Sequence, residues 1–329
     1  DDSDFDFLAV VRKKVEVEIQ GSRLVQTMVF TMQRFRSAFS KGDAFLRTLL
    51  THGLLLFDRQ FAQEFYAQPM PASSTGALKE RGELQEQARS KLFFFLRTHE
   101  PAEARRALAQ LAVNVTRTML SELGEVPAGK ADLVEVAKLY FGSTFAKLLR
   151  KCFEKTASEN ELFRLSGELE QWQKQFAIQA GFIKELAAGL QGPPLQFKAL
   201  CLQMLRILSG EECVVKQNQS IDADGVISRS GEPIFVAIKS LKRGFMGPDD
   251  MHLPKARPLV VVLNHLKELP PSQRPPITEQ QHAIFEKSGI SLIDSRDVFQ
   301  LCVRRLLAVE PDKPTWEHLS EPHFSNKEG

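Results

Sequence analysis

Residues 221–240, IDADGVISRSGEPIFVAIKS, constrain the fold more than any other stretch of the chain. They contain two short apolar runs around a polar turn, which is the pattern of two β-strands that pair as a hairpin. Asp224 stands shortly before the first run, and Lys239 follows the second. Side chains alternate between the two faces of a strand, so positions 237 and 239 face the same way. A hairpin is therefore predicted to bring Asp224, Ala237 and Lys239 together.

An acid and a lysine at the ends of adjacent strands are residue types that phosphodiester hydrolysis uses. Hydrolysis needs a hard divalent cation with oxygen ligands, which polarises the phosphoryl group and acidifies a water. A lysine on the same face stabilises the negative charge that develops in the transition state. A second carboxylate is expected two residues before the lysine, but that position holds Ala237.

At these residues the chain resembles the PD-(D/E)XK, or restriction-endonuclease-like, nuclease superfamily. Members carry an Asp, often followed by Gly, and then a strand that ends in Glu or Asp, any residue, and Lys. The corresponding residues here are Asp224 with Gly225, and Ala237 with Lys239. The resemblance covers approximately residues 195–309, and the order of helices and strands expected there also fits it.

The resemblance implies a metal-dependent nuclease that hydrolyses phosphodiester bonds, in DNA rather than RNA, with a role in genome defence or DNA repair by analogy. It implies Mg²⁺ or Mn²⁺ as the cofactor, held by Asp224, by the residue at 237 and by Glu212 near the end of the preceding helix. Lys239 would assist the attacking water or the transition state. Because Ala237 carries no carboxylate, this chain itself is predicted to be inactive.

Two explanations for Ala237 are open. The protein is either a natural pseudo-nuclease that only binds, or it carries an alanine introduced in place of a natural acid to disable cleavage. The second explanation is favoured because Asp224, Gly225 and Lys239 are all present, whereas a site released from catalysis tends to lose several members. The rival functional hypothesis is a non-enzymatic helical scaffold, or a nucleic-acid-binding protein, with a degenerate nuclease core.

Nucleic-acid contacts are predicted around the loop that follows Lys239. Phosphate contacts from lysine and arginine supply much of the affinity of such proteins and make it sensitive to salt. A net charge of +2 means that a basic surface must be local. The alternative is an ordinary solvated loop. The predicted contact residues are Lys216, Lys242, Arg243, Lys255 and Arg257.

Length and composition predict a soluble intracellular protein with two domains. A chain of 329 residues is long enough for two cores, and 43% hydrophobic and 26% charged residues are typical of soluble proteins. The four cysteines are far apart, which argues against a zinc site or a disulfide framework. No apolar run reaches membrane-spanning length and no signal peptide is visible, so no membrane association is expected.

The overall fold class is predicted to be α+β. Residues 1–192 are expected to form an all-α domain that positions substrate, regulates activity or oligomerises, although the pattern of residues 8–19 suits a strand as well as a helix. The prolines after Gly192 are expected to mark a boundary. Residues 193–310 are expected to form an α/β sandwich of nuclease type around a central mixed sheet, and residues 311–329 a tail.

A heptad-like run of mostly apolar residues spans residues 162–190. Such a seam packs either inside a helical bundle of the same chain or against a second copy as a dimerisation arm. Both alternatives are open from the sequence, and the mixture of aromatic and aliphatic residues slightly favours the first. The seam consists of Leu162, Leu165, Leu169, Trp172, Phe176, Gln179, Ile183, Leu186 and Leu190.

Overall fold

The computed structural model of the chain forms two compact units, residues 1–84 and 85–329, and each is described by itself. The described residues are 5–11, 25–43, 75–190, 192–209, 214–216, 223–229, 232–240, 247–264 and 277–309, together with residues 46, 49, 50, 61 and 65.

The described residues of the first unit include two strands, so the prediction that residues 1–192 are all helical is wrong here. Strands β1 (Phe5–Val11) and β2 (Val25–Thr31) pair in parallel, and helix α1 (Met32–Ser40) follows β2 directly. Thr31 caps α1, because its hydroxyl oxygen accepts a hydrogen bond of 3.1 Å from the Arg34 backbone N–H. The helix packs on a small aromatic core that consists of Phe30, Phe35, Phe39, Leu46 and Phe65.

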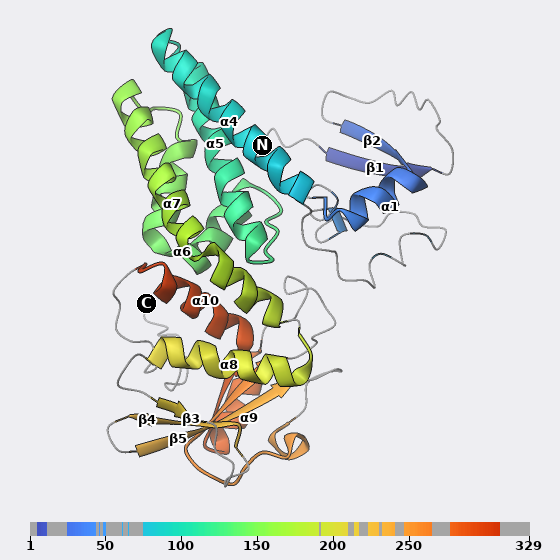
Figure 1. The fold of residues 1–329 in the computed structure, drawn as a ribbon, viewed down its shortest axis with the longest axis vertical. Coiled ribbons are helices and arrows are strands. Elements are labelled where there is room, and N and C mark those ends of the chain that lie inside the picture. The colour runs from blue at the N-terminus through green and yellow to red at the C-terminus, as the bar shows by residue number, and fades with distance from the viewer. Residues whose placement is uncertain are drawn as a thin grey trace. The chain divides into compact units, whose positions relative to one another are not determined.

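The second unit begins with a bundle of four helices, α4 (Thr75–Arg97), α5 (Pro101–Glu122), α6 (Lys130–Phe153) and α7 (Glu159–Leu190) (Figure 1). Only the part of α4 from Gln85 onward belongs to this unit. Helix α5 is amphipathic, and its apolar stripe is buried. The stripe consists of Leu108, Leu111, Ala112, Val115 and Met119.

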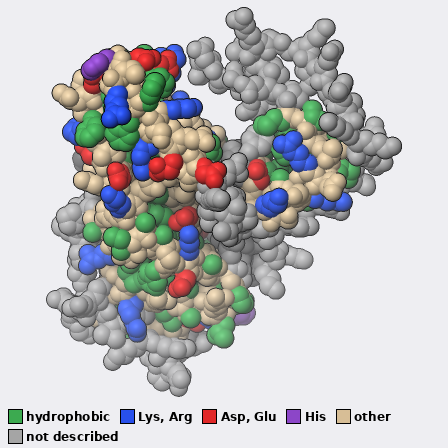
Figure 2. Space-filling view, turned by 45° about the horizontal axis from the view of Figure 1, so that its top comes forward, with side chains coloured by type: hydrophobic (Ala, Val, Ile, Leu, Met, Phe, Trp, Pro, Cys, Tyr) green, Lys and Arg blue, Asp and Glu red, His purple; other side chains and the backbone are tan. Residues whose placement is uncertain are grey.

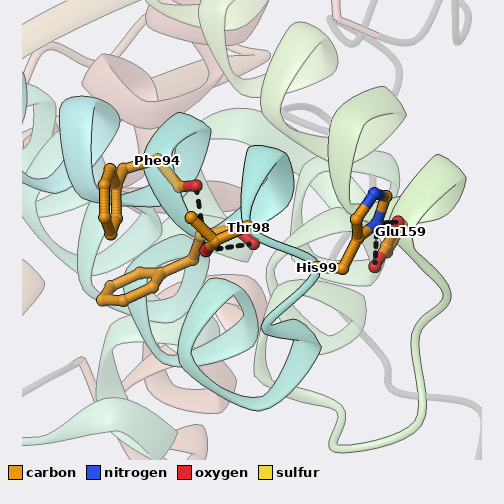
Figure 3. Close-up of polar contacts among 5 residues, drawn as sticks. Phe94, Thr98, His99 and Glu159 are labelled. Carbon is orange, nitrogen blue, oxygen red and sulfur yellow. Dashed lines mark hydrogen bonds and ion pairs between the residues drawn. The ribbon is translucent and has the colours of Figure 1, made fainter.

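The turn between α4 and α5 is held by side-chain contacts (Figure 3). The Thr98 hydroxyl donates to the Phe94 carbonyl at 3.2 Å, and His99 then adopts a positive φ of 57° that ends the helix. His99 Nδ1 lies 3.2 Å from a carboxylate oxygen of Glu159, in the first turn of α7. The His99 side chain is 81% exposed, so this contact sets local geometry more than it stabilises the fold.

The heptad-like seam of α7 packs inside the chain's own core. Seven of its nine members are buried in the same cluster as residues of α5, α6 and α8, and Trp172 packs against that cluster. Gln179, the polar member, is half-buried. The structure therefore has the intramolecular alternative, in which most of the seam is covered by helices of the same chain.

A mixed sheet follows, as predicted, and it has five strands in the described part of the chain. Its order is β3 (Val214–Lys216), β4 (Gly225–Arg229), β5 (Glu232–Ser240), β6 (Leu259–Asn264) and β7 (Ile290–Asp294). Strands β3, β4 and β5 are antiparallel neighbours, whereas β5, β6 and β7 run parallel. All six residues of β6 are buried, as expected for a strand that is covered on both faces.

Helices cover both faces of this sheet. Helices α8 (Pro194–Ser209) and α10 (Ser295–Leu306) pack on one face, between the sheet and the bundle (Figure 1). Helix α9 (Glu279–Lys287) packs on the other face, where Phe285 is fully buried, and the short 3₁₀ helix η1 (Pro248–Met251) lies in the connection from β5 to β6. Thr278 begins α9 with a capping box, in which its hydroxyl accepts from the Gln281 backbone N–H and the Gln281 side chain accepts from the Thr278 backbone N–H.

The segment at 192–194 separates two helices but not two cores. Helix α7 ends at Leu190 and α8 begins at Pro194, and a single hydrophobic cluster continues from the bundle through α8 and α10 to the sheet. The ring of Phe299 on α10 packs against that of Tyr140 on α6, with centroids 6.0 Å apart. The bundle and the sheet are thus parts of one unit, and residues 310–329 lie outside the described residues.

No helix in the described part of the chain is long and apolar enough to cross a membrane.

Burial of the thiols makes stability fall at alkaline pH. Burial raises the pKa of Cys152 and Cys302 to about 12, against about 8.5 for an exposed thiol. Above about pH 8.5 the unfolded chain loses these protons while the folded chain keeps them, so stability decreases as pH rises toward about 12. Urea unfolding at about pH 8 and about pH 10 is expected to show this decrease, and Cys152→Ala is expected to reduce the slope of stability against pH by about 1 kcal/mol per pH unit over this range. An unchanged slope would contradict the assignment to Cys152.

Candidate active site at the ends of strands β4 and β5

Asp224 lies where the pairing of β4 with β5 ends. Its backbone N–H donates to the Val236 carbonyl at 2.9 Å, and Gly225, the first residue of β4, pairs with Val236. The Asp224 Oδ2 atom accepts a hydrogen bond of 2.7 Å from the Ile238 backbone N–H. The hairpin thus places the carboxylate against the β5 backbone between positions 237 and 239, as the sequence predicts.

The second oxygen of this carboxylate is held by Lys198 of α8, which sequence reasoning did not single out. Lys198 Nζ lies 2.6 Å from Asp224 Oδ1, and the two side chains are 41% and 20% exposed. Lys198 and Arg206 are the two charged residues of an otherwise largely apolar helix. A lysine on such an apolar helix indicates that its ammonium group has a specific partner in the fold, but the sequence does not reveal which residue that partner is.

Ala237 does not join Asp224 on one face of the sheet. It is 1% exposed and belongs to the cluster under α9, with Val261 and Leu292, whereas the buried residues of α8 belong to the cluster on the opposite face. The Asp224 carboxylate reaches toward α8. The predicted grouping is therefore assembled only in part, with Asp224 close to the backbone at 237 but not beside the Ala237 methyl group.

Lys239 is half-buried near the end of β5. It pairs with Leu263 of β6, which pairs in turn with Asp294 at the end of β7. Because side chains alternate, Lys239 is on the same face of β5 as Ala237. Asp224 and Lys239 thus share one end of the sheet, where the parallel strands finish and where ligands bind in open α/β sheets.

Cys201 of α8 lies close to the site and is a neutral thiol. Burial raises its pKa well above the usual range, and the negative charges of Asp224 and Asp294 raise it further. A reactive cysteine needs the opposite environment, one that stabilises the thiolate. Cys201 is therefore a core residue and not a nucleophile.

The predicted nucleic-acid contacts are described only in part. Lys255 is exposed, but the Arg257 guanidinium donates to the carbonyls of Ser288, Pro254 and Ala256 at 3.2, 2.9 and 2.9 Å. Arg257 therefore ties its loop to the turn before β7. On the face in Figure 2, cationic and anionic side chains are interspersed and do not gather into one basic surface. Lys242, Arg243 and Glu212 lie outside the described residues, as does the side chain of Lys216.

The residues at this site do not fit a divalent cation in the chain with Ala237. Mg²⁺ and Mn²⁺ take several oxygen ligands, with carboxylates preferred. Asp224 supplies a single carboxylate, and both of its oxygens already accept hydrogen bonds from Lys198 and Ile238. Among the described residues, no three His, Cys, Asp or Glu side chains are grouped as metal ligands would be.

The fold is a mixed α/β layer joined to a helical bundle. Compared with protein-family models, curated proteins and solved structures, the chain has no match. The residues at the strand ends and the order of the strands are therefore the features of the chain that bear on its function.

Proposed function

We propose that residues 193–310 form a nuclease core of the PD-(D/E)XK type. With an acid at position 237 it would cleave phosphodiester bonds in DNA with Mg²⁺ or Mn²⁺, and with Ala237 it binds nucleic acid without cutting it. The helical bundle would position the substrate or regulate access to it. The order of the strands supports this proposal, because an antiparallel hairpin that carries Asp224 and Lys239 precedes a strand parallel to β5.

One observation carries the proposal, namely the 2.7 Å hydrogen bond from the Ile238 N–H to Asp224. It holds an acid beside the backbone of the strand that bears Ala237 and Lys239, which supports the proposal in part, because the motif also asks for the acid on the same face as these two residues. Asp-Gly is a common turn dipeptide, and a simple turn would not need the carboxylate to reach across to β5. The half-buried Lys239 supplies the cation that phosphate chemistry needs at the same end of the sheet.

Restoring the acid with Ala237→Glu is the test. Supercoiled plasmid and single-stranded DNA would be incubated with the substituted protein in Mg²⁺, in Mn²⁺ and in EDTA. We expect cleavage with metal, none with EDTA, and none by the chain as it stands. Ala237→Glu combined with Lys239→Ala should lose the cleavage, since Lys239 would no longer stabilise the developing charge.

Thermal melting of the Ala237→Glu protein separates a folding failure from a functional one. Position 237 is buried among apolar side chains, so an unpaired glutamate there lowers stability. If the acid completes a metal site, Mn²⁺ should raise the melting temperature of Ala237→Glu but not that of the parent chain. A folded Ala237→Glu protein that neither cuts DNA nor responds to Mn²⁺ would refute the nuclease proposal.

The alternative is a non-enzymatic scaffold, and exposed aromatic residues on the bundle favour it. Phe93 and Phe94 on α4 and Phe163 on α7 are 41%, 57% and 63% exposed, and the rings of Phe93 and Phe163 lie 6.2 Å apart. Exposed aromatic groups of this kind are enriched at protein interfaces. A scaffold predicts no effect of metal and no salt-dependent binding of DNA to the chain as it stands, which a titration of labelled DNA at several salt concentrations would reveal.

A further inference from the structure

We infer that the exposed side of helix α6 binds the phosphate backbone of a nucleic acid, independently of base sequence. This basic face consists of Lys138, Lys147 and Lys151 of α6 and Arg304 of α10. The inference rests on the proposed function, because it assigns the nucleic-acid binding proposed there to a surface of the helical bundle.

Helix α6 folds back on itself at Gly142. Arg150 Nη2 lies 2.9 Å from Glu135 Oε1, although the two residues are 15 positions apart in the sequence. Fifteen residues of a regular helix span about 22 Å, which is more than these two side chains can bridge. Likewise, Lys130 Nζ lies 5.9 Å from the centre of the Phe153 ring. The two halves of α6 therefore run side by side as a hairpin, and the non-helical backbone of Gly142 makes the turn.

This hairpin gathers three lysines on one side. Glu135 and Arg150 lie opposite each other, so Lys138 in the first half and Lys147 in the second half come to the same level, nearer the turn. Residues three or four apart share one side of a helix, so both lysines are on the side of the exposed Glu135–Arg150 pair, and Lys151 follows Lys147 there. All three lysines are exposed, and none has an ion pair within the part of the chain that the structure describes.

Arg304 of α10 adds a fourth positive charge to this face. Its guanidinium donates to the carbonyls of Lys138 and Leu139 at 2.8 Å, which places it beside Lys138. These carbonyls satisfy N–H groups of Arg304 but do not neutralise its charge, and no described carboxylate pairs with it. The positive potential of the basic face is therefore drawn from two helices.

The acids around the basic face do not cancel its charge. Its charged neighbours are Lys130, Asp132, Glu154 and Arg305, together with the ion pairs Glu135–Arg150 and Glu168–Arg164. Each of the two ion pairs is neutral. The unpaired cations therefore outnumber the unpaired acids, and an anion with several charges is attracted to this side of the bundle.

A phosphate backbone fits the basic face better than a membrane surface does. A helix that lies on a membrane inserts an apolar side between the lipids. The apolar side of α6 is instead buried in the core, although Leu139 is 44% exposed. Lys147 and Lys151 are about 6 Å apart along the helix, and a DNA strand carries one charge about every 3.4 Å, so the two lysines can reach neighbouring phosphates of one strand. Lysines contact phosphates as point charges, which gives no preference for base sequence.

Fluorescence anisotropy of a short labelled DNA duplex, titrated with the chain at several salt concentrations, tests the inference without reference to cleavage. Lys147→Gln combined with Lys151→Gln should weaken binding at low salt by at least about tenfold. The slope of log affinity against log salt should become shallower by about two, because each lost phosphate contact releases about one counterion fewer. Both lysines are exposed, so the variant should fold, and circular dichroism would verify this.

Lys91→Gln combined with Arg97→Gln is the matched control, since it removes the same net charge from exposed positions of α4. It should leave the salt slope unchanged. Vesicles that contain phosphatidylserine should not bind the chain, and binding to them in place of DNA would overturn the inference in favour of a membrane surface.

The same titrations separate the inference from the proposed function. If the chain binds DNA and the Lys147 and Lys151 substitutions leave affinity and slope unchanged, the proposed binding stands and the basic face is not its site. If these substitutions weaken binding but the Ala237→Glu protein cuts no DNA, the inference stands and the nuclease proposal fails. A chain that binds no DNA even at low salt would refute both the inference and the proposed binding.

Discussion

Glu125→Gln is expected to destabilise the unit of residues 85–329 by roughly 3–5 kcal/mol. Glu125 follows α5 and is 3% exposed. Both of its carboxylate oxygens accept hydrogen bonds of 2.8 Å from Arg296 of α10, and the Tyr140 hydroxyl donates to it at 2.5 Å. This network joins the bundle to the helix that covers the sheet, so its loss affects the packing of both.

The expected loss of stability is large because Glu125→Gln leaves the positive charge of Arg296 in place. Burial by itself lowers the pKa of Arg296, but the negative charge of Glu125 raises it above its usual value, so the guanidinium stays charged. Burial raises the pKa of Tyr140 well above its usual range, and the negative charge of Glu125 raises it further. The phenol therefore keeps its proton and remains a hydrogen-bond donor. A glutamine at 125 leaves a largely buried guanidinium without its counter-ion, which costs more than the pair itself contributes.

Urea unfolding followed by circular dichroism measures the change. The matched control is Glu135→Gln, which breaks the ion pair with Arg150 on the surface, where the side chains are 61% and 55% exposed. That pair should contribute at most about 1 kcal/mol. If Glu125→Gln and Glu135→Gln unfold at the same urea concentration, the buried network does not join the bundle to α10 as described.

Local sequence signals account for some elements of the sheet layer, because the chemistry of a few neighbouring residues determines them. The capping box at Thr278 and the uniformly apolar run that forms β6 depend on a few neighbouring residues. The domain boundary predicted at residues 192–194 could not be judged from such local signals. Whether a proline pair separates two domains depends on contacts such as Glu125 with Arg296, which are 171 residues apart in the sequence. No local pattern carries that information.

At the candidate site, too, the features that depend on neighbouring residues were predictable and those that depend on distant contacts were not. Hairpin pairing was enough to place Asp224 beside the β5 backbone at 237–239, but it did not place the carboxylate on the face of Ala237. The partner of Asp224 depends on how α8 crosses the sheet, which is decided by packing of its apolar face and not by the residues near Lys198. The strands of residues 5–31 were missed for a related reason, since their apolar pattern suited either state and pairing between distant segments decided it.

Gly142 breaks α6 in its interior, and Arg304 of α10 compensates for the break. Its φ of 78° and ψ of 176° belong to a region that is essentially restricted to glycine. In a regular helix the carbonyls of Lys138 and Leu139 accept from the residues four positions later, which here are at the kink. The Arg304 guanidinium donates to both carbonyls at 2.8 Å. These two hydrogen bonds at the kink are thus a second contact between the bundle and α10.

Gly142→Ala is therefore expected to destabilise the protein by about 1–3 kcal/mol. A Cβ atom is strained by these backbone angles themselves, whether or not neighbouring side chains leave space for it. Gly167→Ala on α7 is the matched control, since a Cβ there meets nothing within 4 Å and the residue is helical and exposed. It should stabilise the protein by about 0.5–1 kcal/mol through higher helix propensity. Urea unfolding of the two variants should shift in opposite directions. A Gly142→Ala protein as stable as Gly167→Ala would mean that residue 142 does not adopt this backbone conformation and that α6 has no kink there.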